Sequence, residues 1–172
     1  RFPERAATAL AVLVERAESV RALRADDDPA NGAPLDGHPT LMRAMFQTPG
    51  IEAVRPEGLR LVERCVAEGL GVGILTNELM DFQGREWVES QPWFGYFPVL
   101  VDSTELGVRK PDPRPYLVAI EQMGLPADEI VFIDDNPTYA AGGEAVGLRS
   151  ILLDVSDPAA AFAQAAVELG LA

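Results

Sequence analysis

The stretch Val131-Phe132-Ile133-Asp134-Asp135-Asn136 decides how this chain is expected to fold. Its three apolar residues predict a short strand that is buried on both faces, as in a parallel sheet. Pro137 follows, and a proline in that position favours the start of a helix. Two carboxylates, Asp134 and Asp135, therefore stand at the carboxyl end of a strand, which is the edge where open α/β sheets bind ligands.

Adjacent carboxylates at such an edge have two interpretations. They repel each other unless a cation compensates their charge, and carboxylate oxygens are ligands that suit Mg²⁺. Asp134 and Asp135 are therefore candidate metal ligands. The pair also fits a structural role, in which Asp135 caps the following helix and interacts favourably with its dipole. The pair by itself does not distinguish the two.

Two other segments place polar groups in comparable positions. Val72-Gly73-Ile74-Leu75 predicts a second buried strand, and Thr76-Asn77 follows it with a hydroxyl and an amide that can hold the oxygens of an anion. Lys110 lies in a loop rich in Gly and Pro, just before a predicted helix. An anion site, a cation and a divalent metal are the groups that phosphoryl transfer requires. We therefore expect Thr76, Lys110 and Asp135 to converge on one cleft.

From residue 55 onward, predicted strands and helices alternate along the chain. Strands are expected at 71–75, 96–101, 130–133 and 149–153. Helices are expected at 56–68, 79–89, 113–123 and 137–146, and a last one opens at Asp157-Pro158. This alternation predicts the α/β class, with a Rossmann-like three-layer arrangement around a parallel sheet joined by right-handed crossovers.

Residues 1–55 show a different pattern and are expected to be mainly helical. Ala, Leu, Glu and Arg dominate residues 3–25, which favours a single helix. Residues 26–39 are rich in Asp, Gly, Pro and Asn and predict a loop, and residues 40–46 predict a short helix. We therefore divide the chain into a helical segment at 1–55 and an α/β core at 56–172.

Together, Thr76-Asn77, Lys110-Pro111 and Asp134-Asp135 resemble the second, third and fourth motifs of the haloacid dehalogenase-like (HAD) hydrolase superfamily. Residues 102–116, DSTELGVRKPDPRPY, particularly resemble the branch that contains the N-terminal phosphatase domain of soluble epoxide hydrolase. The resemblance covers about residues 56–155. It implies a HAD-like core, over which the helical segment would form a short cap.

The resemblance also implies a role for each motif residue. Thr76 would bind the transferring phosphoryl oxygens, and Asn77 would position the nucleophile or the substrate. Lys110 would neutralise charge on the nucleophile and the phosphate. Asp135 would ligate Mg²⁺ directly, and Asp134 would act through a water or another indirect contact.

The first motif of the family is not recognisable in this chain. That motif is a strand followed by Asp-x-Asp, which supplies the covalent nucleophile and the general acid/base. Asp26-Asp27-Asp28 has no apolar strand before it, and Leu10–Val14 is followed by Glu15-Arg16-Ala17, which would place Glu and Ala where two Asp belong. We therefore expect the central first strand to be missing, the nucleophile to lie upstream of Arg1, and this chain to be a fragment that is inactive on its own.

The resemblance leaves more than one function open. The favoured one is a Mg²⁺-dependent phosphatase that acts on a small phosphorylated metabolite through an aspartyl-phosphate intermediate. Dehalogenases of the same family need no metal, so the Asp pair favours the phosphatase. A phospho-receiver domain has the same residue types, but its Asp pair comes first and its Lys last. A non-catalytic binding or scaffold protein of the family is the remaining alternative, and it predicts no Asp-x-Asp motif in the parent sequence.

Composition limits the partners, the metal sites and the cellular location that can be expected for the protein. The formal net charge of −13 argues against a nucleic-acid partner. The single cysteine, Cys65, cannot form an intrachain disulfide and is expected to be a packed thiol in a reducing, cytoplasmic location. With one His and one Cys, zinc sites of the usual kind are excluded. No apolar run is long enough to predict a membrane span.

Two further features of the core are expected to serve packing. The aromatic residues between 87 and 97 are expected to pack a helix against the following strand. Gly142-Gly143, inside a predicted helix, is expected to let the backbone approach a neighbouring element.

Overall fold

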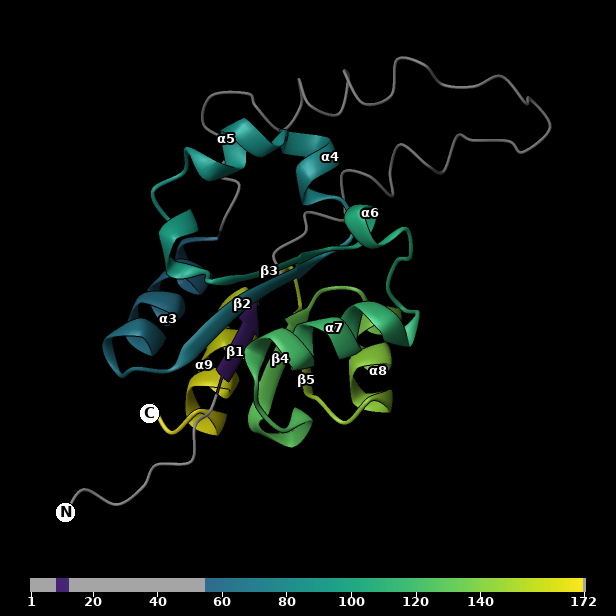
Figure 1. The fold of residues 1–172 in the computed structure, drawn as a ribbon. Coiled ribbons are helices and arrows are strands. Elements are labelled where there is room, and N and C mark those ends of the chain that lie inside the picture. The colour runs from purple at the N-terminus through teal and green to yellow at the C-terminus, as the bar shows by residue number, and fades with distance from the viewer. Residues whose placement is uncertain (1–8, 13–54, 172) are drawn as a thin grey trace.

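A parallel sheet in the order β3-β2-β1-β4-β5 forms the centre of the computed structural model, which describes residues 9–12 and 55–171 (Figure 1). The strands are β1 (Ala9–Val12), β2 (Gly71–Thr76), β3 (Val99–Asp102), β4 (Ile130–Asp134) and β5 (Arg149–Leu152). Every neighbouring pair of strands is parallel. The chain proceeds from β1 to β3 on one side and places β4 and β5 on the other, so the strand order reverses beside β1.

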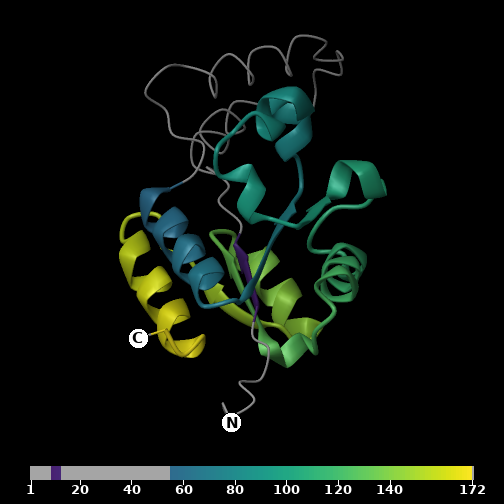
Figure 2. The same ribbon diagram turned by 60° about the vertical axis from the view of Figure 1, so that its left-hand side comes forward.

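Helices cover both faces of this sheet and complete three layers. They are α3 (Pro56–Ala67), α4 (Leu79–Gln83), α5 (Arg85–Glu89), α6 (Ser103–Leu106), α7 (Pro113–Met123), α8 (Pro137–Ala145) and α9 (Pro158–Glu168), with 3-10 turns at Phe94–Tyr96 (η1) and Ala127–Glu129 (η2). The turned view shows α3 and α9 on one face and α7 and α8 on the other (Figure 2). The predicted three-layer α/β fold is confirmed.

Most of the predicted elements of the core agree with the structure to within one or two residues. The main difference is the helix expected at 79–89, which is divided into α4 and α5. Gly84 separates the two helices with φ of 81° and ψ of 138°, a conformation that only glycine adopts readily. The strand expected at 96–101 begins later, at Val99, because η1 precedes it.

Residues 9–12 correct the prediction that the central strand is missing. Ala9–Val12 pairs with Ile130–Ile133 of β4, and its first three residues pair with Gly71–Gly73 of β2. These four residues were expected to be part of a helix. Without them the inner edges of β2 and β4 would lack partners for their backbone groups, and an unpaired buried edge is costly. Helix propensity differs by only about 0.7 kcal/mol per residue among ordinary residues, so strand pairing outweighs it here.

The remaining predictions for the N-terminal segment concern residues outside the described part of the chain. They include the cap-like helices, the loop at 26–39, His38, and the carboxylates of Glu15 and Asp26-Asp27-Asp28. The division at residue 55 stays a prediction, with the difference that Ala9–Val12 belongs to the core sheet.

The core is apolar and closely packed around β4. Ile130, Val131, Phe132 and Ile133 are each at most 1% exposed. Cys65 is fully buried, and burial raises the pKa of its thiol to about 11, as expected for a packed thiol rather than a nucleophile. Trp93 packs edge-on against Phe94 and Phe97, and the aromatic residues between 87 and 97 belong to the core or pack against it, which agrees with a packing role.

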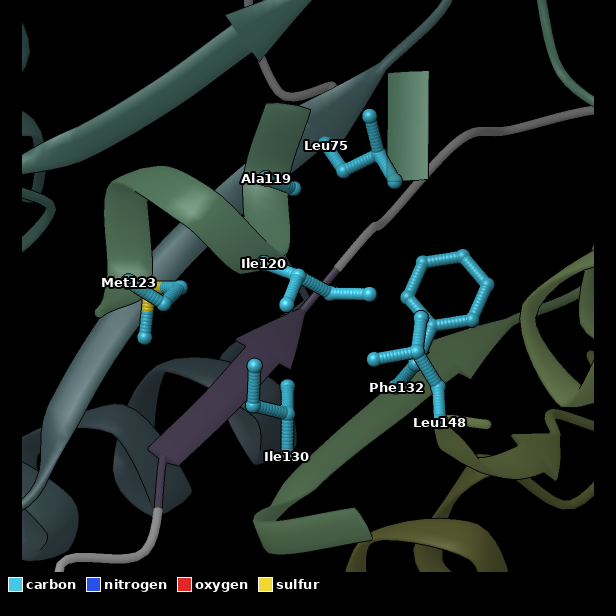
Figure 3. A pocket seen from close by; sticks show the side chains of 7 residues that line it. All are labelled: Leu75, Ala119, Ile120, Met123, Ile130, Phe132 and Leu148. Carbon is cyan, nitrogen blue, oxygen red and sulfur yellow. The ribbon is translucent and has the colours of Figure 1, made fainter. Parts of the chain in front are cut away.

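A small pocket lies between α7 and the sheet (Figure 3). Only apolar side chains line it: Leu75, Ala119, Ile120, Met123, Ile130, Phe132 and Leu148. A pocket without polar groups offers no hydrogen bonds to water or to a polar ligand. We therefore regard it as a packing gap of the core.

Gly143 confirms the expected close approach of α8 to the sheet and yields a testable stability effect. A Cβ at this position would lie 2.6 Å from Ser150 Oγ and 2.8 Å from Phe132 Cδ1. We expect Gly143→Ala to lower the free energy of unfolding by about 1–3 kcal/mol, because the crowded side chains must shift. Urea denaturation measures this, with Gly95→Ala as the control, since a Cβ there meets nothing within 4 Å. Equal stability of the two variants would contradict the close packing.

Candidate functional site

Polar residues end three strands of the sheet at its carboxyl edge, two of them on one side of β1 and one on the other. Thr76 ends β2, Asp102 ends β3 and Asp134 ends β4. Thr76 and Asp102 are direct partners in the strand register. The strand order reverses beside β1, between β2 and β4, and the carboxyl ends flanking such a point are where open α/β sheets bind ligands.

Lys110 and Asp134 form a fully buried ion pair at this edge. Lys110 Nζ lies 2.7 Å from Asp134 Oδ2, and neither side chain is exposed to solvent. The ammonium also donates to the carbonyl oxygen of Leu75 at 3.2 Å. Leu75 belongs to β2 and Asp134 to β4, the strands on either side of β1. The ammonium therefore links the two strands that flank the centre of the sheet.

Asn77 holds the loop that carries Lys110. Its Oδ1 accepts a hydrogen bond from the Lys110 backbone N–H at 2.8 Å, and its Nδ2 donates to the Lys110 carbonyl oxygen at 3.3 Å. The side chain is 4% exposed. Asn77 thus fixes the backbone of Lys110 relative to the end of β2, which is a positioning role that the sequence did not reveal.

Thr76 is the other motif residue at the end of β2, and it is 3% exposed. Its hydroxyl oxygen accepts a hydrogen bond from the backbone N–H of Glu78 at 3.3 Å. Glu78 forms an ion pair with the half-exposed side chain of Arg109. Arg109 is therefore held on the outer side of the loop, while its neighbour Lys110 points inward.

Asp134 and Asp135 differ in surroundings, which bears on a metal site. Asp134 Oδ2 accepts from Lys110, and its Oδ1 accepts from the Asn136 backbone N–H at 2.8 Å. Asp135 is only partly buried. The cap of α8 is Asn136, whose Oδ1 accepts from the Thr138 N–H at 2.9 Å, so the alternative in which Asp135 caps this helix is wrong.

Asp134 and Asp135 can supply some of the ligands that Mg²⁺ requires, but not all of them. Mg²⁺ is commonly held by one or two carboxylates, with waters and a phosphate completing its shell. A site with Asp135 as the carboxylate ligand would match that arrangement, because both oxygens of Asp134 already accept hydrogen bonds from protein groups. Across residues 9–12 and 55–171, no group of three or more His, Cys, Asp or Glu side chains could hold a metal ion. Other ligands would therefore have to come from water and substrate, or from outside this part of the chain.

Asp102 is a buried residue of the site region for which no role was predicted. Its Oδ2 accepts from the Met80 N–H at 2.8 Å, and its Oδ1 accepts from the backbone N–H and the hydroxyl of Thr104 at 2.9 and 2.7 Å. The buried carboxylate caps α6 and ties α4 to β3. An Asp directly before Ser103-Thr104, the first residues of a short helix, is the signal that could have predicted the cap.

Comparison with known proteins decides the family. The family model described as haloacid dehalogenase-like hydrolase matches residues 2–147. The chain belongs to this family. Its match spans most of the sequence and includes Thr76, Asn77, Lys110, Asp134 and Asp135.

Individual relatives of this HAD-like chain are mostly described as phosphatases. A phosphoserine phosphatase of Thermus thermophilus is 29% identical over 135 residues, which are 78% of this chain and 53% of that protein. Bifunctional epoxide hydrolase 2 of Sus scrofa is 28% identical over 95 residues, 54% of this chain and 17% of that protein. The chain spans about half the length of the curated phosphatases that it matches.

Solved structures support the same fold. CbbY of Rhodobacter sphaeroides, crystallised with xylulose-(1,5)-bisphosphate, has a TM-score of 0.61 and 20% identity, and the match covers 77% of this chain and 62% of that chain. At this identity the likeness concerns the fold alone. Within the described ranges, none of the helices is both long and apolar enough to span a membrane.

Proposed function

We propose that this HAD-like chain supplies the anion-binding and metal-binding half of a phosphohydrolase site. The whole protein would hydrolyse small phosphorylated metabolites with Mg²⁺ through an aspartyl-phosphate intermediate. The observation that carries the proposal is the buried contact of Lys110 with Asp134 at the carboxyl edge where Thr76 and Asn77 end β2. The phosphatase relatives support the reaction class.

Each residue has a role that follows from its contacts. Lys110 places a positive charge across the end of β1, where charge on a phosphoryl group would be stabilised. Asn77 keeps that charge in place by fixing the Lys110 backbone. Thr76 offers a hydroxyl donor for a phosphoryl oxygen, because its oxygen is only an acceptor toward Glu78.

The metal would lie at Asp135, with Asp134 behind it. When bound, Mg²⁺ supplies positive charge to the phosphoryl oxygens and to the leaving group. Asp134 contributes by holding Lys110 and the start of α8 in a fixed geometry.

The nucleophile has to come from residues outside the described ranges. Ala9–Val12 occupies the central strand position in this chain and contains no carboxylate. Ala9–Val12 already pairs with β2 on one side and with β4 on the other. In the proposal, an Asp-x-Asp motif from outside the described ranges reaches the carboxyl end of this strand.

Metal dependence separates the phosphatase from a dehalogenase-type hydrolase of the same family. We expect hydrolysis of an aryl phosphate by the whole protein to be lost when Mg²⁺ is removed by a chelator, and to return when Mg²⁺ is added. A rate that is the same with and without Mg²⁺ would contradict the phosphatase proposal. Asp135→Asn tests the proposed metal ligand directly. We expect this variant to respond more weakly to Mg²⁺ while the protein stays folded.

One observation favours a second candidate, a non-catalytic binding protein of the HAD family. The central position is filled by Ala9–Val12, and the sequence after it continues with Glu15-Arg16-Ala17 instead of two Asp. The two candidates differ in the parent coding sequence. A strand that ends in Asp-x-Asp upstream of Arg1 would support catalysis, and the absence of such a strand would support binding without turnover.

A further inference from the structure

Lys110 is the only lysine in the sequence, and its ammonium is buried. A lysine ammonium has three N–H donors. Asp134 Oδ2 and the Leu75 carbonyl oxygen accept two hydrogen bonds from it. Burial of an ammonium requires that its charge be compensated from several sides.

Among the described residues, two aromatic rings also face this ammonium. Lys110 Nζ lies 5.1 Å from the ring centroid of Tyr139 and 5.5 Å from that of Phe132. Both distances are within the range in which the face of a ring attracts a cation. Phe132 comes from β4 and Tyr139 from the first turn of α8, so the rings reach Lys110 from different elements. We call these two rings the Lys110 clamp.

Tyr116 of α7 contacts both residues of the Lys110 clamp. Its hydroxyl donates to the Tyr139 carbonyl oxygen at 2.8 Å, and its ring packs edge-on against Phe132 at 5.7 Å. Burial, followed by the negative charge of Asp134, raises the pKa of the Tyr116 phenol, so the hydroxyl remains a donor. Gly142 makes room for it, because a Cβ there would lie 2.5 Å from the Tyr116 hydroxyl oxygen.

We propose that Tyr139 is a positioning residue that, with Phe132, holds the Lys110 ammonium between β2 and β4 for contact with an anionic substrate. The anion rests on the function proposed above, whereas the placement of Lys110 does not. A lysine side chain has four rotatable bonds, and among the described residues the hydrogen bonds of its ammonium go to one carboxylate and one carbonyl, so the rings add a further restraint on its position. Tyr116 affects Lys110 indirectly, by holding Tyr139 in place, and Gly142 leaves the space that Tyr116 needs.

The test uses the 172-residue chain with ¹³C- and ¹⁵N-labelled lysine, which gives the signals of Lys110 alone. Rings that face the ammonium shield the ε-methylene and ammonium protons. We expect Tyr139→Leu to move these signals toward the values of a solvent-exposed lysine, and Tyr139→Phe to preserve them because it keeps the ring. Tyr96→Leu is the matched control, since this half-buried tyrosine lies in η1.

Binding of inorganic phosphate is the second readout, followed by NMR titration of the same samples. We expect Tyr139→Leu to weaken binding by about 2- to 30-fold, and Tyr139→Phe to bind like the unchanged chain. If Tyr139→Leu does not fold, Tyr139→Met replaces it with a flexible side chain that has no ring.

Three results would overturn the proposal. They are unchanged Lys110 signals without the ring, equal effects of Phe and Leu at position 139, and displaced Lys110 signals with unchanged phosphate binding. If the unchanged chain bound no phosphate at all, the proposed anion site would fail, and the Lys110 signals would still decide whether the rings place the ammonium.

Discussion

The 172-residue chain is expected to release no phosphate from an aryl phosphate, with or without Mg²⁺, whereas the whole protein is expected to turn over. The chain offers Thr76, Lys110 and Asp135, but Ala9–Val12 at the centre of the sheet contains no carboxylate. Removing one electrostatic contact from an active site costs about 10²–10³ in rate, whereas removing a covalent nucleophile removes the reaction path. A continuous phosphate-release assay on matched amounts of both proteins measures the difference.

Variants of the 172-residue chain test whether a carboxylate near the end of the central strand restores turnover. Glu15→Asp combined with Ala17→Asp creates an Asp-x-Asp motif three residues after Val12. If these positions correspond to the first motif of the family, the double variant should gain turnover that the unchanged chain lacks. Turnover by the unchanged chain would contradict the prediction. Glu15→Gln, and a variant with Asp26-Asp27-Asp28 replaced by Asn, would then identify the carboxylate responsible.

Asp134→Asn is expected to lower the free energy of unfolding by about 3–5 kcal/mol. The substitution keeps the shape of the side chain but leaves the fully buried Lys110 ammonium without its counter-charge. Breaking one side of a buried pair is far more costly than the pair's own net contribution, because an uncompensated charge stays in the core. Urea denaturation of the 172-residue chain measures the loss.

Two further variants identify the cause of that loss. Asp128→Asn changes an exposed carboxylate and should shift stability by no more than about 0.5 kcal/mol. Lys110→Met added to Asp134→Asn removes the stranded charge and should recover much of the stability, because replacing both partners of a buried pair is often nearly neutral. A loss below about 1 kcal/mol for Asp134→Asn would show that the pair is not buried in solution.

The sequence determined the class of the fold through its apolar strands. Val131-Phe132-Ile133 and Val72-Gly73-Ile74-Leu75 have no polar face, so they had to be covered on both sides by helices. The polar residues after them had to meet at one edge, because the carboxyl ends of parallel strands lie together. Thr76, Asn77, Asp134 and Asp135 could therefore be named as candidates before their contacts were known.

The sequence did not determine which segment lies at the centre of the sheet. Ala9–Val12 has helix-favouring neighbours and only four residues in the strand, and local propensity predicts a helix there. The strand forms because β2 and β4 offer backbone partners on both sides, and these lie about 60 and 120 residues further along the chain. Strand pairing between residues so far apart cannot be predicted from a short local stretch of sequence.

Tertiary structure alone also decided the partners of each candidate residue. Asn77 was expected to position the nucleophile or the substrate, and the structure shows that its amide holds the backbone of Lys110. Asp134 and Lys110 are 24 residues apart in sequence and in direct contact in space, with Tyr139 and Phe132 on other sides of the ammonium. Residue types reveal which groups can carry charge or donate hydrogen bonds. The packing of α8 and the Lys110 loop against β2 and β4 decides which of these groups come into contact. A charge that is buried in this way is stable only when it is paired.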